Sequence, residues 1–454
     1  MRSVHKGCSG RGLVWAFWLI FTTSGWALAD DAPVSKVDPG DTAWMLTSAA
    51  LVLLMTPALG FFYGGMVRGK NVLGTIMHSF FMIAIISVQW AILGYSLSFG
   101  PDIGHFVGNL DWAFLSGVGG DPNPDYAPTI PHQAFMIYQA MFAVITPALI
   151  SGAFAERMRF SAFVVFSLAW ATIVYDPIAH WVWGVNGWLH NLGALDFAGG
   201  TVVHISSGVA ALVAALVLGP RLGYPKETIL PNNLTLTVLG AGILWFGWFG
   251  FNGGSALASG ALATSAFVVT HMATAAATLG WAAAECYHRG KASVLGAASG
   301  AVAGLVAITP ASGFVDPVGA LIIGIAAGVV CYISAVWVKK AIGYDDSLDA
   351  WGVHGVGGAL GAMLTGAFAK NAINSAGKGW LTDGNAGQML IQFYDVAAVF
   401  VYCGIMTFII LKVISIFVPL RMSEAQLRVG DDAVHGETAY ALGSDDDTAS
   451  AVAD

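Results

Sequence analysis

The chain has 454 residues and a formal net charge of −8 at pH 7. Hydrophobic residues make up 56% of it and charged residues only 10%, far below the ~25% of an average soluble protein. This composition, together with 57 glycines, excludes a soluble protein and predicts an all-α polytopic membrane protein. Much of the negative charge lies near the chain ends, and no basic cluster in the sequence indicates binding to nucleic acid.

The first 29 residues have the layout of a cleaved signal peptide. Arg2, Lys6 and Arg11 give a positive start, residues 13–27 are an apolar middle, and residues 27–29 (Ala-Leu-Ala) form a small-residue exit. We therefore predict that residues 1–29 are removed and that the mature chain begins on the outer side of the membrane. An uncleaved first anchor is the alternative, but the apolar middle is short for a membrane span.

Eleven apolar runs follow, each of roughly 20 residues, the length that a helix needs to cross ~30 Å of hydrocarbon. They are residues 43–63, 74–98, 133–154, 160–180, 198–219, 233–252, 262–286, 293–309, 317–338, 350–369 and 389–417. Up to residue 340, Lys and Arg gather in alternate loops, as cytoplasmic loops do. An outer N-terminus and eleven crossings predict a membrane domain over 30–417 and a cytoplasmic tail over 418–454, with a disordered acidic end at 443–454.

Two histidines, His204 and His354, lie inside apolar runs and share one local phrase. Each follows a valine and precedes a glycine by four residues. We expect each histidine to lie in the last span of a group of five. Because five is an odd number of crossings, the second half (233–369) would have the opposite orientation in the membrane and form an inverted repeat of the first half (43–219). The run 389–417 is then an added helix. Such repeats bring matched residues together near the pseudo-twofold axis, where substrate sites lie.

An ionisable side chain at membrane depth is costly and is retained mainly where it faces a pathway or a partner. A helix-to-helix hydrogen bond is the alternative for a single histidine, and a metal site is the alternative for the pair. Without a nearby cysteine or an inward carboxylate, two histidines make a poor ligand set. Three cysteines in or beside apolar runs likewise indicate neither a disulfide framework nor a Cys-type metal site; they are Cys286, Cys331 and Cys403.

Small residues predict where the helices pack closely. Glycines four residues apart allow two backbones to approach each other. We read such pairs in the second half as packing faces: Gly300 with Gly304, Gly324 with Gly328, and Gly357 with Gly361.

Aromatic and hydroxyl side chains gather on the predicted outer side. Trp183, Phe251 and Ser255 are expected in outer loops, and Phe142 in the outer half of its span. Aromatic faces attract small cations, and a hydroxyl accepts a hydrogen bond from one. Any single tryptophan at this depth also fits the interfacial aromatic belt.

Asp196 and Asp349 each precede a histidine-bearing helix by a short interval. An aspartate there accepts backbone hydrogen bonds and favours the positive end of the helix dipole. We therefore expect both to cap helix starts rather than to contact a ligand, although a cap also lowers the potential felt by a nearby cation.

Seven stretches together resemble the ammonium transporter family, the Amt, Mep and Rh group, and favour its bacterial Amt branch. They are spread over almost the whole mature chain: GFFYGGMVRGKNVL (60–73), FAVITPALISGAFAERMRF (142–160), LDFAGGTVVH (195–204), WFGWFGFNGGS (245–255), ITPASGFVDPVGALIIG (308–324), DDSLDAWGVHGVGG (345–358) and HGETAY (435–440).

The resemblance implies an ammonium transporter or channel of the cell inner membrane, a homotrimer with one pore in each subunit and no cofactor. Phe142, Trp183 and Ser255 match an outer ammonium-recruiting site, with Asp196 beside it. Phe142 and Phe251 match the rings that close the outer pore mouth. The family's paired pore histidines and the ring on the pore wall correspond to His204, His354 and Trp248.

One departure is visible, because the loop between Trp181 and Asp196 is about one residue longer than in similar bacterial chains, which affects the position of Trp183. The resemblance also implies that a PII-type signal protein docks on the cytoplasmic face, where Leu420-Arg421 and residues 435–440 are the expected tail elements. An ammonium sensor that signals through the tail and an intramembrane metalloenzyme remain the alternatives from other functional classes.

The apolar character of the spans explains why such a pore would admit ammonium and exclude potassium. Moving an intact cation through apolar surroundings forfeits its hydration at a cost of many kcal/mol. Ammonium can instead give up a proton, cross as ammonia and recover a proton inside, which potassium cannot do. Our hypothesis is that the twin histidines carry the proton or orient the ammonia, while the outer aromatic cluster concentrates the cation.

Overall fold

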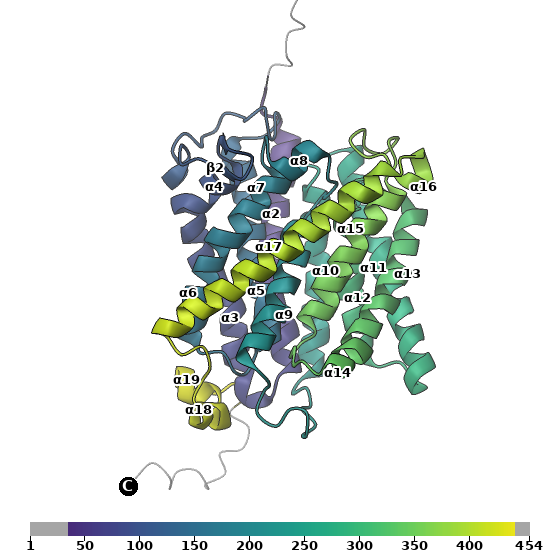
Figure 1. The fold of residues 1–454 in the computed structure, drawn as a ribbon. Coiled ribbons are helices and arrows are strands. Elements are labelled where there is room, and N and C mark those ends of the chain that lie inside the picture. The colour runs from purple at the N-terminus through teal and green to yellow at the C-terminus, as the bar shows by residue number, and fades with distance from the viewer. Residues whose placement is uncertain (1–34, 441–454) are drawn as a thin grey trace, which may run out of the picture.

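The computed structural model describes residues 35–440. The predicted signal peptide and the acidic end at 443–454 lie outside the described residues. Within them the chain forms one bundle of helices standing side by side (Figure 1). The strands in this part of the chain are one short antiparallel pair, β1 (Asp102–Ile103) and β2 (Val107–Gly108).

Helical turns with 3-10 or π geometry are labelled η. The first half contains α2 (Pro39–Met66), η1 (Gly69–Asn71), α3 (Val72–Gln89), η2 (Trp90–Gly94), α4 (Tyr95–Phe99), η3 (Ala113–Leu115), α5 (His132–Phe154), α6 (Phe160–Trp170), η4 (Ala171–Tyr175), α7 (Asp176–Trp183), α8 (Trp188–Leu192), η5 (Gly200–Ile205) and α9 (Ser206–Leu218). The second half contains α10 (Leu234–Gly254), α11 (Ala261–Arg289), α12 (Val294–Ile308), α13 (Pro317–Ile333), η6 (Ser334–Val338), α14 (Lys339–Ile342), η7 (Trp351–Gly355) and α15 (Val356–Phe368). The chain continues through α16 (Trp380–Asp383), α17 (Gly387–Phe417), α18 (Glu424–Val429) and α19 (Asp431–His435).

The structure confirms the predicted fold class. Nine helical stretches of the described chain are long and apolar enough to cross a membrane, and α12 is a shorter apolar helix. The consecutive elements η7 and α15 supply a helix at the remaining predicted run, 350–369. Every one of the eleven predicted runs is therefore helical.

Glycines bring helix backbones of the second half into direct contact. A Cβ added to Gly324 would lie 2.2 Å from the carbonyl oxygen of Ala273, and one added to Gly361 would lie 2.2 Å from that of Ala307. Real Cβ atoms never come so close to backbone, so α13 on α11 and α15 on α12 require glycine at these positions. The predicted packing faces are confirmed.

The inverted repeat shows itself in a reciprocal contact between the two histidine-bearing helices. A Cβ added to Gly208 would lie 2.1 Å from the backbone nitrogen of Gly355, beside His354. A Cβ added to Gly358 would lie 2.9 Å from the carbonyl oxygen of Gly200 and 3.0 Å from Cβ of His204. Each half thus uses the glycine four residues after its histidine to make room for the other half.

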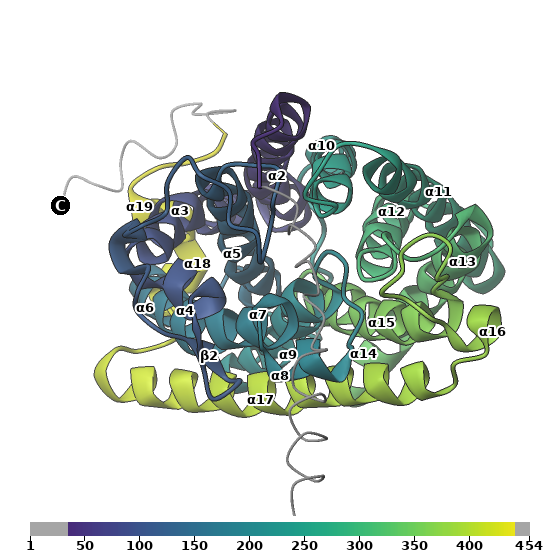
Figure 2. The ribbon, with the colours of Figure 1, turned by 90° about the horizontal axis from the view of Figure 1, so that it is seen from above.

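The eleventh helix, α17, lies outside the pair of halves. It runs obliquely across one side of the bundle (Figure 1), and the view from above shows it spanning both halves (Figure 2). The side-chain amide of its buried Gln392 makes two hydrogen bonds to the backbone of Leu195. Its oxygen accepts from the Leu195 N–H at 2.7 Å, and its nitrogen donates to the Leu195 carbonyl at 2.9 Å. This added helix therefore fixes the segment that leads into η5.

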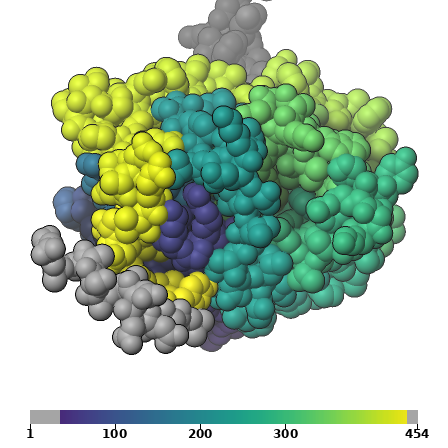
Figure 3. All heavy atoms as spheres, turned by 90° about the horizontal axis from the view of Figure 1, so that it is seen from below, coloured from purple at the N-terminus to yellow at the C-terminus, as the bar shows by residue number. Residues whose placement is uncertain are grey.

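The two ends of the bundle differ in what they carry. One end, called here the tail face, carries α14, α18 and α19, and the opposite face carries α7, α8 and α16 (Figure 1). Viewed from below, the tail segment in yellow lies beside the first-half elements and leaves the green second half uncovered (Figure 3).

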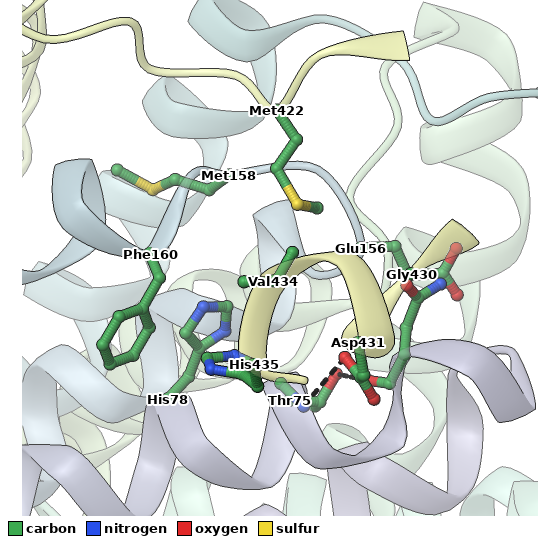
Figure 4. A pocket seen from close by; sticks show the side chains of 12 residues that line it. Thr75, His78, Glu156, Met158, Phe160, Met422, Gly430, Asp431, Val434 and His435 are labelled. Carbon is green, nitrogen blue, oxygen red and sulfur yellow. Dashed lines mark hydrogen bonds between the residues drawn. The ribbon is translucent and has the colours of Figure 1, made fainter. Parts of the chain in front are cut away.

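The tail docks on the first half by reciprocal helix capping. Asn71, at the N-cap position of α3, makes no side-chain cap. Asp431 of the tail supplies the cap instead, accepting from the backbone nitrogens of Leu73 at 2.7 Å and Gly74 at 3.0 Å. Lys70 in turn donates to the last carbonyls of α18, at 2.8 Å and 2.5 Å. Figure 4 shows the tail residues facing α3 across this contact. Burial raises the pKa of Asp431 to about 6.

We predict that Asp431→Ala releases the tail. The change leaves two partly buried backbone donors of α3 without an acceptor, which costs about 1–3 kcal/mol. Trypsin cleavage after the exposed Arg428 is expected to become about tenfold faster, as judged by gel band intensities over time. The neighbouring exposed Asp432 provides the control, because Asp432→Ala removes the same group without touching α3. Equal cleavage of the two variants would contradict the capping role.

Candidate functional site

The two histidines meet at the centre of the bundle. His204 lies in the π-helical turn η5 and His354 in the π-helical turn η7. Their Nδ1 atoms lie 3.3 Å apart and their ring centroids 5.3 Å apart. Both residues are buried, with exposed fractions of 1% and 3%. A shared hydrogen bond at this distance needs one Nδ1 that carries a proton and one that accepts it, as two neutral imidazoles provide.

A small apolar chamber lies beside the pair. Its volume is about 10 Å³, close to the space that one water molecule needs. Both histidines line it together with apolar and aromatic side chains, among them Ile145, Leu149, Trp248 and Phe251. The Nε2 atom of His204 is buried and has no hydrogen-bond partner among the described residues. The chamber is therefore apolar, and one of the two histidines that line it keeps an unpartnered ring nitrogen.

Aromatic rings stack above the histidines. The ring of Trp248 lies 5.4 Å from that of His204 at an interplanar angle of 22°, and its Nε1 donates to the hydroxyl of Thr309 at 2.9 Å. Phe251 lies 6.0 Å from His204 and 4.3 Å from Phe142. Because Phe251 lines the chamber and Phe142 lines a second cavity, the two phenylalanines separate these spaces.

This second cavity lies toward the opposite face and has a volume of about 310 Å³. Phe142, Trp183, Asp196 and Ser255 all line it. Trp183 stands edge-on to Phe142 with centroids 5.9 Å apart, and its Nε1 donates to the Asp196 carbonyl at 2.9 Å. The Ser255 hydroxyl donates to the carbonyl of Phe251 at 2.9 Å. Sequence positions more than a hundred residues apart thus converge on one space.

Two local predictions about these residues were wrong. Trp183 is the last residue of α7, and Phe251 lies inside α10, whereas both were expected in loops. Ser255 follows α10 directly as its C-cap residue. The glycines near the end of α10 are weak helix formers but permit close packing, since a Cβ at Gly254 would lie 2.6 Å from the Ser48 side chain. Tertiary contact therefore extends the helix past its apolar run.

Asp196 caps the histidine-bearing helix of the first half, as expected. Its carboxylate accepts from the backbone nitrogens of Gly199 at 2.8 Å, Gly200 at 2.5 Å and Thr201 at 2.8 Å. These donors are the free N–H groups at the start of η5, which a carboxylate at a helix N-terminus satisfies.

The corresponding prediction for Asp349 was wrong. Asp346 is the cap of the second half and accepts from Ala350 N at 3.1 Å and Trp351 N at 2.8 Å. Asp349 instead accepts a hydrogen bond from Lys339 at 2.7 Å. The spacing in the sequence could have identified this cap, because Asp346 precedes His354 by eight residues, just as Asp196 precedes His204. Burial raises the pKa of Asp346 above its ordinary value.

Within residues 35–440, no group of three or more His, Cys, Asp or Glu side chains is placed to hold a metal ion. The fold and the site define a membrane transporter or channel: a bundle of membrane helices encloses a narrow apolar chamber in line with an aromatic cavity at one face.

The comparison with known proteins gives the family. The model of the Ammonium Transporter Family matches residues 43–440, and the chain belongs to this family. An ammonium transporter of Bacillus subtilis is 54% identical over 402 residues, which cover 88% of this chain and 98% of that relative. An ammonium transporter of Archaeoglobus fulgidus is 47% identical over 88% of this chain and 99% of its own length.

Solved structures agree in fold. The crystal structure of Candida albicans Mep2 has 38% sequence identity and a TM-score of 0.81, covering 86% of this chain and 88% of that chain. A structure described as a sensor Amt protein has 28% identity and a TM-score of 0.81, covering 88% and 98%.

Proposed function

We propose that this transporter recruits ammonium at its aromatic cavity, removes a proton and conducts ammonia through the chamber between His204 and His354. The observation that carries this proposal is the contact of two buried imidazoles in a space with room for about one small molecule. An intact cation loses its hydration there, whereas neutral ammonia fits apolar walls and finds a hydrogen-bonding atom at Nε2 of His204.

The aromatic cavity supplies the recruitment step. Trp183 and Phe142 present ring faces and edges to the same space, and cation–π attraction stabilises a small cation by about 0.5–2 kcal/mol. The Ser255 hydroxyl offers an acceptor, and Asp196 adds negative potential although its oxygens already accept backbone hydrogen bonds. The rings of Phe142 and Phe251, 4.3 Å apart, form the gate below this site.

Orientation follows from the distribution of charge. Basic loop residues such as Arg68 and Arg221 lie toward the tail face, and cytoplasmic loops carry such an excess. We place the tail face in the cytoplasm and the aromatic cavity outside, in the cell inner membrane, after removal of residues 1–29. Three such subunits form a homotrimer in which each keeps its own pore, and no cofactor is required.

Uptake of radiolabelled methylammonium into cells or proteoliposomes tests the proposed function. Excess ammonium is expected to abolish uptake, and the same concentration of potassium is expected to leave it unchanged. Equal competition by potassium would overturn the proposal.

A second prediction concerns recruitment. Trp183→Ala removes the ring that faces Phe142, so we expect the KM for methylammonium to rise about tenfold while the maximal rate changes less than about twofold. The matched control is Trp188→Ala, because Trp188 is a partly exposed tryptophan that does not line the cavity. A fall in maximal rate at unchanged KM would assign Trp183 to a different step.

The tail gives the cytoplasmic face a role in signalling in addition to transport. We propose that a PII-type signal protein docks on the cytoplasmic face and contacts the tail, including Leu420-Arg421 and residues 435–440. The likeness to a sensor Amt protein favours a signalling role for the tail in addition to transport. Binding between the purified chain and a purified PII-type protein is expected to be lost when residues 418–454 are removed. Ammonium-dependent binding without methylammonium uptake would instead make the chain a sensor only.

A further inference from the structure

The two pore mouths can be compared because the repeat places equivalent residues at each. Asp196 at the outer mouth and Asp346 at the inner mouth both cap the helix that carries a pore histidine, eight residues before it. The repeat therefore places a carboxylate at the same position in each half. The difference between the mouths lies in what surrounds that carboxylate.

At the outer mouth, no basic side chain of the described chain pairs with Asp196. The hydrogen bonds that its carboxylate accepts come from backbone N–H groups and from the Thr201 hydroxyl. A cavity of about 310 Å³ opens beside it. The negative potential of this mouth is thus available to an incoming cation.

At the inner mouth, the chain supplies a cation of its own. The Nζ of Lys339 donates to Oδ1 of Asp349 at 2.7 Å. The lysine side chain is only 16% exposed although it lies at the end of a membrane helix. Asp349 adopts a φ of 60°, a left-handed backbone that is uncommon for a residue other than glycine and marks a constrained position.

The same ion pair acts on the cap and connects to the chamber. Lys339 and Asp349 are both close enough to Asp346 to shift the pKa of its carboxyl, Lys339 downward and Asp349 upward. Tyr63 is buried near the carboxylates of Asp346 and Asp349. Its hydroxyl donates a hydrogen bond to the carbonyl of Leu149, a residue that lines the histidine chamber. Tyr63 therefore connects the neighbourhood of the Lys339–Asp349 ion pair to the wall of the chamber.

We propose that Lys339 determines the sidedness of substrate recognition by occupying, as a tethered alkylammonium ion, the cation position at the inner mouth. A lysine head group has the same charge and donor set as methylammonium, so it competes directly with free ammonium for Asp346 and Asp349. This inference rests on the proposed function. It explains how an inverted repeat with matched carboxylates binds its substrate on one side and releases it on the other.

A passive pathway must reach the same equilibrium from both sides, so Lys339 changes the concentration at which each side saturates and not the direction of net flow. The parent protein is expected to show a KM for methylammonium at least tenfold higher from the inner face than from the outer face. Without the lysine charge, the carboxylates at the inner mouth become available to free ammonium.

The experiment compares methylammonium entry into right-side-out and inside-out membrane vesicles that contain the full chain. For Lys339→Gln we expect the inner-face KM to fall about five- to tenfold while the outer-face KM stays at the parent value. Lys339→Arg keeps the charge and is expected to behave as the parent. The control is Lys340→Gln, because Lys340 is the next residue, is exposed and forms no ion pair within the described chain.

A shift of both KM values by the same factor, or no shift in either, would overturn the role of Lys339 and assign the ion pair to holding the start of η7. If Lys339→Gln is not recovered as a monodisperse protein, Lys339→Met removes the charge with a side chain of similar length. Absence of methylammonium uptake by the parent in both vesicle types would refute the proposed function itself, so the two failures are distinguishable.

Discussion

His204→Ala is expected to lower the rate of methylammonium uptake about 100-fold. The change removes an imidazole that lines the chamber, with its unpartnered Nε2 atom and its Nδ1 contact to His354 at 3.3 Å. Groups that accept or donate a proton during a reaction typically contribute 10²- to 10⁴-fold, so a loss near the lower end is expected when the second histidine remains. Initial rates of uptake into proteoliposomes, normalised to reconstituted protein, provide the measurement.

His271→Ala is the matched control for this prediction. His271 also lies in a membrane helix, α11, but it is exposed on the outside of the subunit and contacts Trp245 rather than the chamber. Its substitution is expected to leave uptake within about twofold of the parent. Similar losses in both variants would indicate a general effect of removing a membrane histidine and would contradict a pore role for His204.

The second large effect is expected for Gly208→Ala, which tests how the halves are joined. The added methyl group would lie 2.1 Å from the backbone nitrogen of Gly355, and a backbone atom cannot rotate away. Overpacking of this kind typically costs about 1–3 kcal/mol, and a clash with backbone lies at the upper end of that range. We expect the midpoint of thermal unfolding in detergent to fall by several degrees, with loss of uptake as the histidines move apart.

Gly242→Ala controls for helix propensity in this comparison. Gly242 lies in α10, and a Cβ there would meet no atom within 4 Å. Alanine is favoured over glycine in a helix by about 1 kcal/mol, so this variant is expected to be as stable as the parent or slightly more stable. A Gly208→Ala protein with the parent's thermal midpoint would show that the reciprocal glycine contact does not hold the halves together.

Periodicity and spacing in the sequence were sufficient to predict the membrane helices and the pairing of the histidines. Apolar length locates helices because hydrocarbon admits few other structures. The shared phrase around His204 and His354 predicted their contact because an inverted repeat brings matched positions to its axis. Asp196 as a cap followed from its position before the helix start.

The errors arose where contacts distant in sequence decide the local structure. The end of α10 was placed two residues too early because packing against α2 extends the helix through Gly253 and Gly254, which resemble a loop. Asp349 was taken for the cap because it lies nearer to the helix start, whereas its left-handed backbone directs it to Lys339. Comparing the two histidine phrases over a longer window would have identified Asp346.

Other features carry no local signal at all. The hydroxyl of Thr309 fixes the ring of Trp248, and Lys70 caps a helix that lies more than 350 positions later in the chain. Such pairs become visible only when the fold is known, because neither partner alone belongs to a recognisable motif. The tail contact that may be followed in Figure 4 belongs to this group.

In the proposed mechanism the substrate crosses because it gives up its charge in a dry chamber. Parallel tracer measurements of methylammonium and rubidium entry into the same proteoliposomes test it most directly, since rubidium is a cation of similar size to ammonium that has no proton to lose. We expect rapid entry of methylammonium, and rubidium entry no faster than into liposomes without protein. Rubidium entry at a comparable rate, suppressed by ammonium, would contradict this mechanism.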